Sequence, residues 1–276
     1  MNFQAPDALP FTGERFIPTL GGNIMLEHFH RYMFALEFVA GCDVLDIACG
    51  EGYGTDLLGC CAKTVVGVDI AEEVVVHASK KYSSAKVAFR QGRAESIPLE
   101  DSTVDVVVSF ETIEHHDKHE EMIAEIRRVL RPGGLLLISS PDKRYYSDIS
   151  NFKNVFHVKE LYKPEFLSLL SKSFSHVSMY GQKIVFGSAI FAEGNSHGLL
   201  TFADDQNIHR AGFADALYNV ALASDDLARI CAAPSSLMEY NLYKSEAMGE
   251  KFRCPFNREP QQGVQAAAKK TSLGVL

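Results

Sequence analysis

An apolar strand that runs into a glycine-rich turn is the feature that most constrains this chain. Residues 44–49 read Val-Leu-Asp-Ile-Ala-Cys, and glycines follow at Gly50, Gly52 and Gly54. Glycine adopts backbone conformations with positive φ and places no Cβ between the backbone and a bound molecule. The turn therefore predicts that a small molecule lies against the carboxyl end of the first strand.

A second acid narrows the kind of ligand. The next apolar run, residues 64–69, ends at Asp69, fifteen residues after Gly54. An acid at this point can accept hydrogen bonds from both hydroxyls of an adenosine ribose. Dinucleotide-binding oxidoreductases have a similar turn, but their third glycine comes three residues after the second. Here it comes two residues after, and Asp46 precedes Gly50 by four, so the spacing argues against an oxidoreductase.

The remaining pattern predicts an α/β fold. Apolar β-branched runs alternate with helical periodicity, which is typical of a parallel, doubly wound sheet covered by helices. The Arg-Pro-Gly-Gly sequence at 131–134 is expected to end a helix and start the next buried strand, because neither Pro nor Gly prolongs a helix. Strands are predicted at 43–48, 64–69, 86–91, 104–109, 134–140, 174–190 and 216–223, and helices at 25–40, 53–61, 71–82, 117–130 and 158–172.

One main domain is expected. With 276 residues and 46% hydrophobic content, the chain can bury a full core. The expected parts are an irregular leader at 1–24, a domain at 25–250 with a lid-like insertion at about 190–214 before the last strand, and a mobile tail at 251–276. The N-terminal helix at 25–40 precedes the sheet and could cover the ligand.

Charge and hydropathy limit the partners. The net charge of −8 offers no basic footprint, so a nucleic-acid partner is not expected, whereas a small molecule or glycan is easier to accommodate. No stretch approaches the roughly 18 to 20 apolar residues of a membrane span, and no secretory signal is evident. We therefore expect a cytoplasmic protein. The oligomeric state is open.

The motifs together resemble those of class I S-adenosylmethionine-dependent methyltransferases over residues 25–225. The resemblance implies S-adenosyl-L-methionine as the cofactor and a seven-stranded, mostly parallel, Rossmann-like sheet with a reversed last hairpin. The implied cofactor residues are Asp46, Gly50, Gly52, Gly54, Asp69, Ile70, Ala94, Glu95 and Phe110. Local sequences at 13–18, 27–32 and 141–143 also resemble a bacterial subgroup found with surface-polysaccharide and O-antigen biosynthesis.

The segment after the fourth predicted strand carries the candidate catalytic residues, Glu111, Glu114 and His115. Their i, i+3, i+4 spacing would put all three on one side of a helical turn at the carboxyl edge of the sheet. Two carboxylates and an imidazole are plausible ligands for Mg²⁺ or another divalent metal, and His157, before a helix, is a fourth candidate. This pairing resembles metal-assisted O-methyltransferases that act on small-RNA 3′ ends or on catechols of the ubiquinone pathway.

Other interpretations of these residues stay open. His115 or His116 could act as a base without a metal, and acids such as Glu114 could instead stabilise a helix start. Lys143 and Arg144 could bind an acidic glycan or belong to a solvated loop. Arg31 and Tyr32 are candidates for contact with the methionine carboxylate.

The sequence thus predicts an O-methyltransferase that acts on a hydroxyl of a carbohydrate or glycoconjugate. Methylation of RNA ends at the 2′ oxygen and methylation of a catechol or quinone-type small molecule are alternatives. A hypothesis of another class is a non-catalytic, cofactor-binding partner in a biosynthetic complex.

Overall fold

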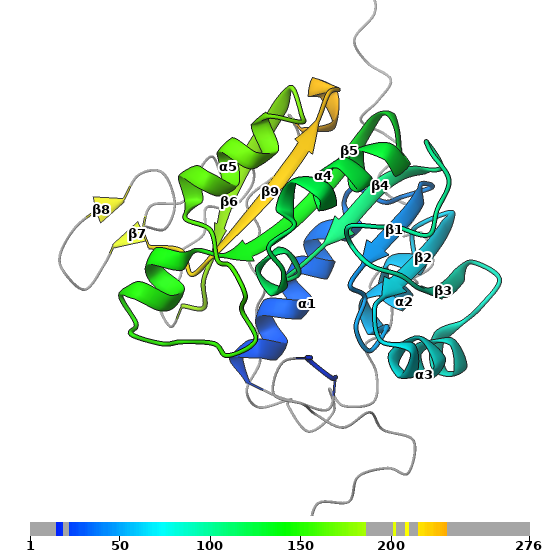
Figure 1. The fold of residues 1–276 in the computed structure, drawn as a ribbon, viewed down its shortest axis with the longest axis horizontal. Coiled ribbons are helices and arrows are strands. Elements are labelled where there is room, and N and C mark those ends of the chain that lie inside the picture. Colours follow the sequence, from blue (N-terminus) through cyan, green and yellow to red (C-terminus); the bar gives the residue numbers. More distant parts are fainter. Residues whose placement is uncertain (1–14, 19–21, 186–200, 203–207, 210–214, 231–276) are drawn as a thin grey trace, which may run out of the picture.

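The computed structural model describes residues 15–18, 22–185, 201–202, 208–209 and 215–230. Its centre is a seven-stranded sheet in the order β3-β2-β1-β4-β5-β9-β6 (Figure 1). The strands are β1 (Asp43–Ile47), β2 (Thr64–Asp69), β3 (Val87–Gln91), β4 (Val104–Ser109), β5 (Leu130–Pro141), β6 (His176–Gln182) and β9 (Tyr218–Ser224). β7 (Thr201–Phe202) pairs separately with β8 (Ile208–His209).

The strand order confirms the doubly wound, mostly parallel sheet. β1 pairs in parallel with β2 on one side and with β4 on the other, so the chain reverses its direction of winding between β1 and β4. β9 lies antiparallel between β5 and β6, which gives the reversed last hairpin. In open α/β sheets ligands bind at the carboxyl ends of the strands beside such a switch point.

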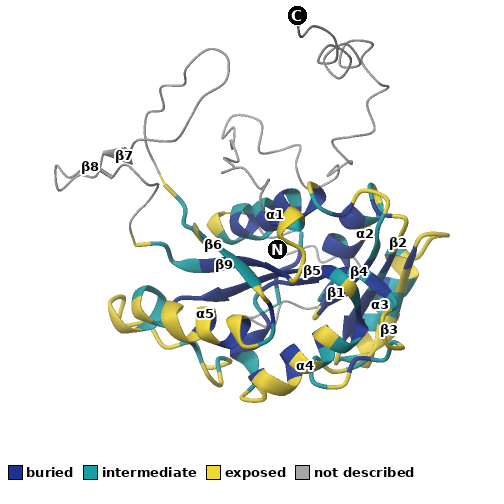
Figure 2. Cartoon of the chain, turned by 90° about the horizontal axis from the view of Figure 1, so that it is seen from above, coloured by how far each residue is buried: buried dark blue, intermediate teal, exposed yellow. Residues whose placement is uncertain are grey.

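Helices cover both faces of the sheet (Figure 2). α1 (Asn23–Leu36) and α2 (Tyr53–Gly59) pack on one face, where Val44, Val106 and Leu135 meet them. α4 (His119–Val129) and α5 (Lys163–Ser171) pack on the other, against Leu45 and Val107. α3 (Glu72–Tyr82) follows β2. Because neighbouring residues of a strand point to opposite faces, these buried strands are apolar at nearly every position.

Two boundaries differ from the sequence prediction for reasons visible in the structure. β5 starts at Leu130, so the Pro-Gly-Gly sequence lies inside the strand, where the pairing with β4 shifts register between Val104 and Val106. The helix expected at 158–172 begins only at Lys163. The backbone N–H groups of Val158 and Lys159 donate to the carbonyl of Glu114 at 2.8 and 3.1 Å, which ties them to the turn after β4 instead.

The outer parts of the chain are only partly described. Phe16 and Ile17 of the expected irregular leader are buried, and Phe16 packs with Met25 and Phe29 of α1. The insertion predicted at 190–214 is described only at β7 and β8, and the predicted tail at 251–276 lies outside the described residues. Within the part that the structure describes, no helix combines the length and apolar character needed to cross a bilayer.

Candidate active site

A cavity of about 750 Å³ opens at the carboxyl edge of the sheet. It lies where β1 and β4 end side by side, and the turn after β1, the ends of β2 and β4, α1 and the segment 146–157 all contribute to its walls. Its volume is within the range of small-molecule and cofactor sites. Of the predicted cofactor residues, those that line it are Gly50, Asp69, Ile70, Ala94, Glu95 and Phe110.

Asp46 lies behind the turn rather than in the cavity wall. Its carboxylate is fully buried and accepts hydrogen bonds from the Thr55 hydroxyl at 2.7 Å and the Tyr32 hydroxyl at 3.2 Å. Burial raises the pKa of Asp46 to about 7, although these hydrogen bonds oppose the rise. Through these hydrogen bonds the Asp46 side chain connects α1 and α2 to the end of β1.

Gly52 and Gly54 also act behind the turn. Gly52 has φ +98° and forms the N-cap of α2, and a Cβ at this residue would lie 2.8 Å from Ala78 Cβ. A Cβ on Gly54 would collide with the Tyr32 ring. The two glycines therefore allow close packing of α2 against α1 and α3, and Gly50 is the glycine of this turn that lines the cavity.

Asp69 connects the end of β2 to this turn. Its carboxylate accepts from the Gly50 N–H at 2.9 Å and from the Ala71 N–H at 3.0 Å, and the side chain lines the cavity. A carboxylate has about four positions at which it can accept a hydrogen bond, so Asp69 can still accept hydrogen bonds from ribose hydroxyls. The structure places the predicted ribose acid where it also fixes the backbone that would contact the cofactor.

Two further acids line the cavity. Glu95, partly buried, accepts from Arg93 Nε at 2.7 Å and Lys118 Nζ at 3.3 Å. Its burial opposes ionisation, but these hydrogen bonds outweigh it and lower the pKa of Glu95 to about 2. Glu51, which the sequence reasoning did not single out, is buried and accepts from Lys81 Nζ at 2.6 Å and from the Tyr82 hydroxyl at 2.7 Å. It ties the glycine turn to α3.

Glu111 does not join Glu114 and His115 in the arrangement that their spacing predicted. The backbone at Glu111 has φ +50°, and helical structure starts only with the short turn η1 (Ile113–His115), so the i, i+3, i+4 rule fails here. Glu111 Oε1 accepts from the Ser139 hydroxyl at 2.6 Å and lies 3.7 Å from Arg31 Nη1. The side chain still lines the cavity, but it points toward β5 and α1.

The structure brings together Glu114, His115 and His157 at the same cavity. One potential ligand atom from each lies within 4.8 Å of the others, and Glu114 is only 1% exposed. The rings of His115 and His157 meet edge to face with centroids 5.2 Å apart. Sequence spacing alone could not show this, because the two histidines are 42 positions apart in the chain.

Hydrogen bonds orient both imidazoles. His115 Nδ1 faces the Phe156 carbonyl at 3.2 Å, which requires a proton on Nδ1 and leaves the lone pair of the neutral ring on Nε2. His157 Nδ1 lies 2.6 Å from Glu160 Oε1, and its Nε2 lies 2.9 Å from Asn154 Nδ2. Glu160 was missed at the sequence level, although the His-x-x-Glu spacing is a signal that could have revealed it.

This donor set fits a divalent cation of borderline hardness. One carboxylate and two imidazoles suit metals such as Zn²⁺ or Mn²⁺ better than Mg²⁺, which prefers oxygen ligands. The carboxylate of Glu160 on His157 is the kind of outer partner that metal-binding histidines have. With bonds of about 2.1 Å, two ligand atoms of one metal lie at most about 4.2 Å apart. Glu114 Oε1 and His115 Nε2 are 3.9 Å apart, and binding at His157 Nε2 would displace the Asn154 amide.

Arg31 of α1 lines the same cavity. It is 3% exposed, donates from Nη1 to Gln182 Oε1 at 2.7 Å, and stacks its guanidinium 5.0 Å from the centre of the Tyr218 ring. Its buried Nε has no hydrogen-bond partner among the residues that the structure describes. The Tyr32 hydroxyl, by contrast, donates to Asp46.

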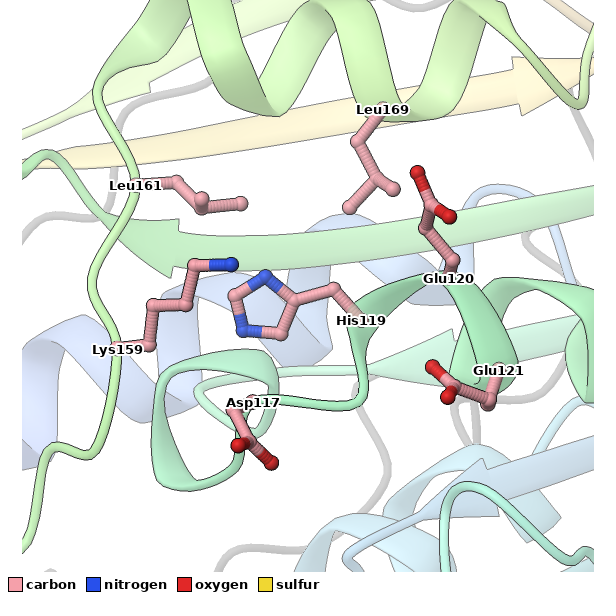
Figure 3. A pocket seen from close by; sticks show the side chains of 7 residues that line it. All are labelled: Asp117, His119, Glu120, Glu121, Lys159, Leu161 and Leu169. Carbon is pink, nitrogen blue, oxygen red and sulfur yellow. The ribbon is translucent and has the colours of Figure 1, made fainter.

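A second, smaller hollow of about 310 Å³ lies on the face covered by α4 and α5. The side chains of Lys159 and His119 point toward each other across it (Figure 3). Burial lowers the pKa of His119, and the charge of Lys159 lowers it further. Glu120 is paired with Lys172 at 2.8 Å. None of the predicted site residues borders this hollow, which is lined by Asp117, His119, Glu120, Glu121, Lys159, Leu161 and Leu169.

Comparison with known proteins agrees with this architecture. Residues 45–138 match the family model described as a methyltransferase domain. A probable S-adenosylmethionine-dependent methyltransferase of Mycolicibacterium smegmatis is 41% identical over 168 residues, which cover 60% of this chain and 65% of the relative. A ubiquinone biosynthesis O-methyltransferase of Roseobacter denitrificans is 30% identical over 134 residues, covering 47% of this chain and 53% of that one. The chain thus spans less than two thirds of either relative.

Among solved structures, the YcgJ protein of Bacillus subtilis has a similar fold, with a TM-score of 0.53 and 18% identity. The match covers 71% of this chain and 97% of that protein. The strand order, the cavity at the switch point and the family match agree with one another. Residues 45–138 are therefore similar in sequence to methyltransferase domains, and the chain has a Rossmann-like fold of the class I methyltransferase type.

Proposed function

We propose that this protein transfers the methyl group of S-adenosylmethionine to a hydroxyl of a carbohydrate or glycoconjugate. The observation that carries the proposal is that one cavity holds both the cofactor turn at Gly50 and Asp69 and the cluster of Glu114, His115 and His157. The O-methyltransferase activity named for the relative from Roseobacter denitrificans supports the choice of an oxygen acceptor.

The cofactor end of the cavity binds and orients the methyl donor. S-adenosylmethionine, when bound, supplies a methyl group on a positively charged sulfur that needs no further activation. Asp69 would accept hydrogen bonds from its ribose hydroxyls, while the Gly50 backbone permits close approach. Arg31 would bind the methionine carboxylate through its buried donor.

The acceptor end lowers the barrier for a poor nucleophile. A sugar hydroxyl attacks a methyl group slowly unless its proton is removed or its pKa is lowered. Glu114, His115 and His157 would hold a divalent cation, whose chemistry here is to lower the pKa of a bound hydroxyl. Tyr146, Phe152 and Tyr218 line the same cavity and provide aromatic side chains that a sugar could contact.

Two measurements test the two ends separately. Asp69→Ala should weaken binding of S-adenosylhomocysteine by at least about tenfold, because the charged acceptor and the backbone anchor are both lost. His157→Ala should leave that affinity unchanged and abolish methyl transfer in a radiolabelled-methyl screen of nucleotide-sugars, lipid-linked glycans and short RNAs. Unchanged cofactor affinity in Asp69→Ala would refute the ribose assignment.

The cation is tested with a chelator. Treatment of the wild-type protein should stop transfer, and Mn²⁺ or Zn²⁺ should restore it in the wild type but not in Glu114→Gln. If transfer survives the chelator and depends on His115 alone, His115 Nε2 acts as a base and the metal assignment is wrong. Methylation confined to the RNA substrates in the screen would instead favour the 2′-O-methyltransferase.

A further inference from the structure

Large apolar side chains are exposed together on one segment at the cavity. Five such residues fall within ten positions, with exposed fractions from 43 to 82%, and we call them the apolar rim: Ile149, Phe152, Val155, Phe156 and Val158. Elsewhere in the described residues, exposed large apolar side chains are scattered, as at Val76 and Leu227. Single exposed apolar residues are ordinary, whereas a cluster marks an interaction surface.

The exposure of the rim follows from how its backbone is held. Val158 N–H donates to the Glu114 carbonyl at 2.8 Å, Phe156 N–H donates to Asn154 Oδ1 at 3.0 Å, and Phe152 N–H donates to the Ser147 carbonyl at 3.2 Å. These bonds fix the loop at both ends and in its middle. Along this backbone the five side chains keep 43 to 82% of their surface exposed, three of them where they line the cavity.

The rim borders the mouth of the candidate active site. Phe152, Val155 and Phe156 line the same cavity as Asp69 and His157. In Figure 1 the segment is the green loop between the helical turn that follows β5 and helix α5. Whatever covers the rim therefore lies beside the entrance to the cavity.

The charges around the rim indicate the chemistry of its partner. Arg144, Lys153 and Lys159 are exposed in or beside it, although the whole chain has a net charge of −8. The acids of residues 144–160 are Asp148 and Glu160, fewer than these three cations, and they accept hydrogen bonds from the hydroxyls of Tyr162 at 2.8 Å and Ser147 at 2.6 Å. Apolar side chains flanked by cations complement a surface that is anionic outside and apolar beneath.

We propose that the apolar rim docks on the surface of a bilayer that contains anionic lipids. The apolar side chains enter the boundary between headgroups and acyl chains, and Lys153 meets the lipid phosphates. Docking turns the mouth of the cavity toward the bilayer. If the proposed function also holds, the acceptor of the methyl group is a glycan carried by a lipid. The identity of the acceptor rests on the proposed function, whereas the docking on a bilayer does not.

Vesicle co-sedimentation of the full chain tests the docking. We expect binding to phosphatidylcholine vesicles that contain about one third phosphatidylglycerol, and much weaker binding to pure phosphatidylcholine. Ile149→Ser/Val155→Ser should lose binding by about tenfold or more, because two exposed apolar anchors are removed. The matched control Val76→Ser/Leu227→Ser removes side chains that are 61 and 52% exposed on other elements, and it should bind as the wild type does.

Four outcomes would overturn the docking: no vesicle binding by the wild type, equal binding to neutral vesicles, equal loss in the control, or wild-type binding by the rim variant. Self-association of the wild type without lipid that the rim variant abolishes would also overturn the docking, and it would indicate a second copy of the chain as the partner of the rim.

Circular dichroism and binding of S-adenosylhomocysteine report whether each variant folds. The vesicle assay contains neither cofactor nor acceptor, so a failure of methyl transfer would refute the proposed function and leave the docking standing.

Discussion

Asp46 carries a buried carboxyl whose pKa differs strongly between the folded and unfolded chain. Burial raises this pKa from an ordinary 3.8 to about 7 in the folded protein. Between these pH values the folded state binds a proton that the unfolded state has lost, so the free energy of unfolding falls as the pH rises from about 4 to about 7. The stabilisation that the protonated Asp46 carboxyl gives to the folded state is fully present below a pH of 3.8 and is lost as the pH rises through about 7.

We therefore expect Asp46→Asn to remove part of that pH dependence. Chemical denaturation of the wild type and of Asp46→Asn at several pH values between 4 and 8 measures the difference directly. The variant should be the less stable protein at low pH relative to the wild type, and the gap should narrow toward pH 7 and above. A gap that is constant across this range would contradict the raised pKa.

Asn154 makes a second prediction at the scale of single residues. Its amide nitrogen lies 2.9 Å from His157 Nε2, the atom that the proposed cation would need. Asn154→Ala releases His157 from that competing hydrogen bond, which is worth about 1 kcal/mol, so the affinity for Mn²⁺ should rise by about fivefold. Isothermal titration with Mn²⁺ compares the variant with the wild type. His157→Ala serves as the control that lacks the imidazole proposed to bind the metal. Binding of Mn²⁺ by His157→Ala that is as tight as in the wild type would show that His157 does not bind the metal.

At the scale of elements, the glycines of the first turn explain how α1 and α2 approach each other. A Cβ on Gly54 would collide with the Tyr32 ring of α1. Gly54→Ala should therefore lower the free energy of unfolding by about 1–3 kcal/mol, the usual cost of overpacking a core. The double variant Gly54→Ala/Tyr32→Ala should be less destabilised than the sum of the single variants, because the obstacle is gone. Additive losses in chemical denaturation would contradict the proposed contact.

The same elements show which parts of the fold the sequence could predict. β1, β2 and β4 were predicted within a residue or two, because buried parallel strands are apolar at nearly every position and end in turns. The start of α5 was predicted wrongly, since local periodicity contains no record of the hydrogen bonds from Val158 and Lys159 to Glu114. Helical spacing likewise grouped Glu111 with Glu114, but the positive φ of Glu111 depends on contacts with β5 and α1 that only the folded chain provides.

At the scale of the whole molecule, hydrogen bonds between residues far apart in the chain hold α1 against β6 and β9. Arg31 donates to Gln182 of β6, which is 151 positions away, and the hydroxyl of Tyr218 in β9 donates to Glu27 at 3.1 Å, 191 positions away. Gln182 Nε2 also donates to the Glu27 carbonyl at 3.0 Å. The reversed hairpin of β6 and β9 thus holds the helix that contributes Arg31 to the cavity wall.

Gln182→Ala should loosen α1 without unfolding the sheet. Two hydrogen bonds between α1 and β6 are lost, so amide hydrogen exchange at residues 23–36 should accelerate while exchange in β1 and β4 stays slow. Because Arg31 loses its orienting partner, the affinity for S-adenosylhomocysteine should fall by severalfold, and saturating ligand should restore slow exchange in α1. The control Gln91→Ala removes a side-chain amide at the end of β3 that contacts Ile70 instead of α1, and it should leave exchange at 23–36 unchanged. Equal exchange in α1 for Gln182→Ala and the wild type would mean that apolar packing alone, through Phe34, Ala35 and Leu36, holds this helix on the sheet.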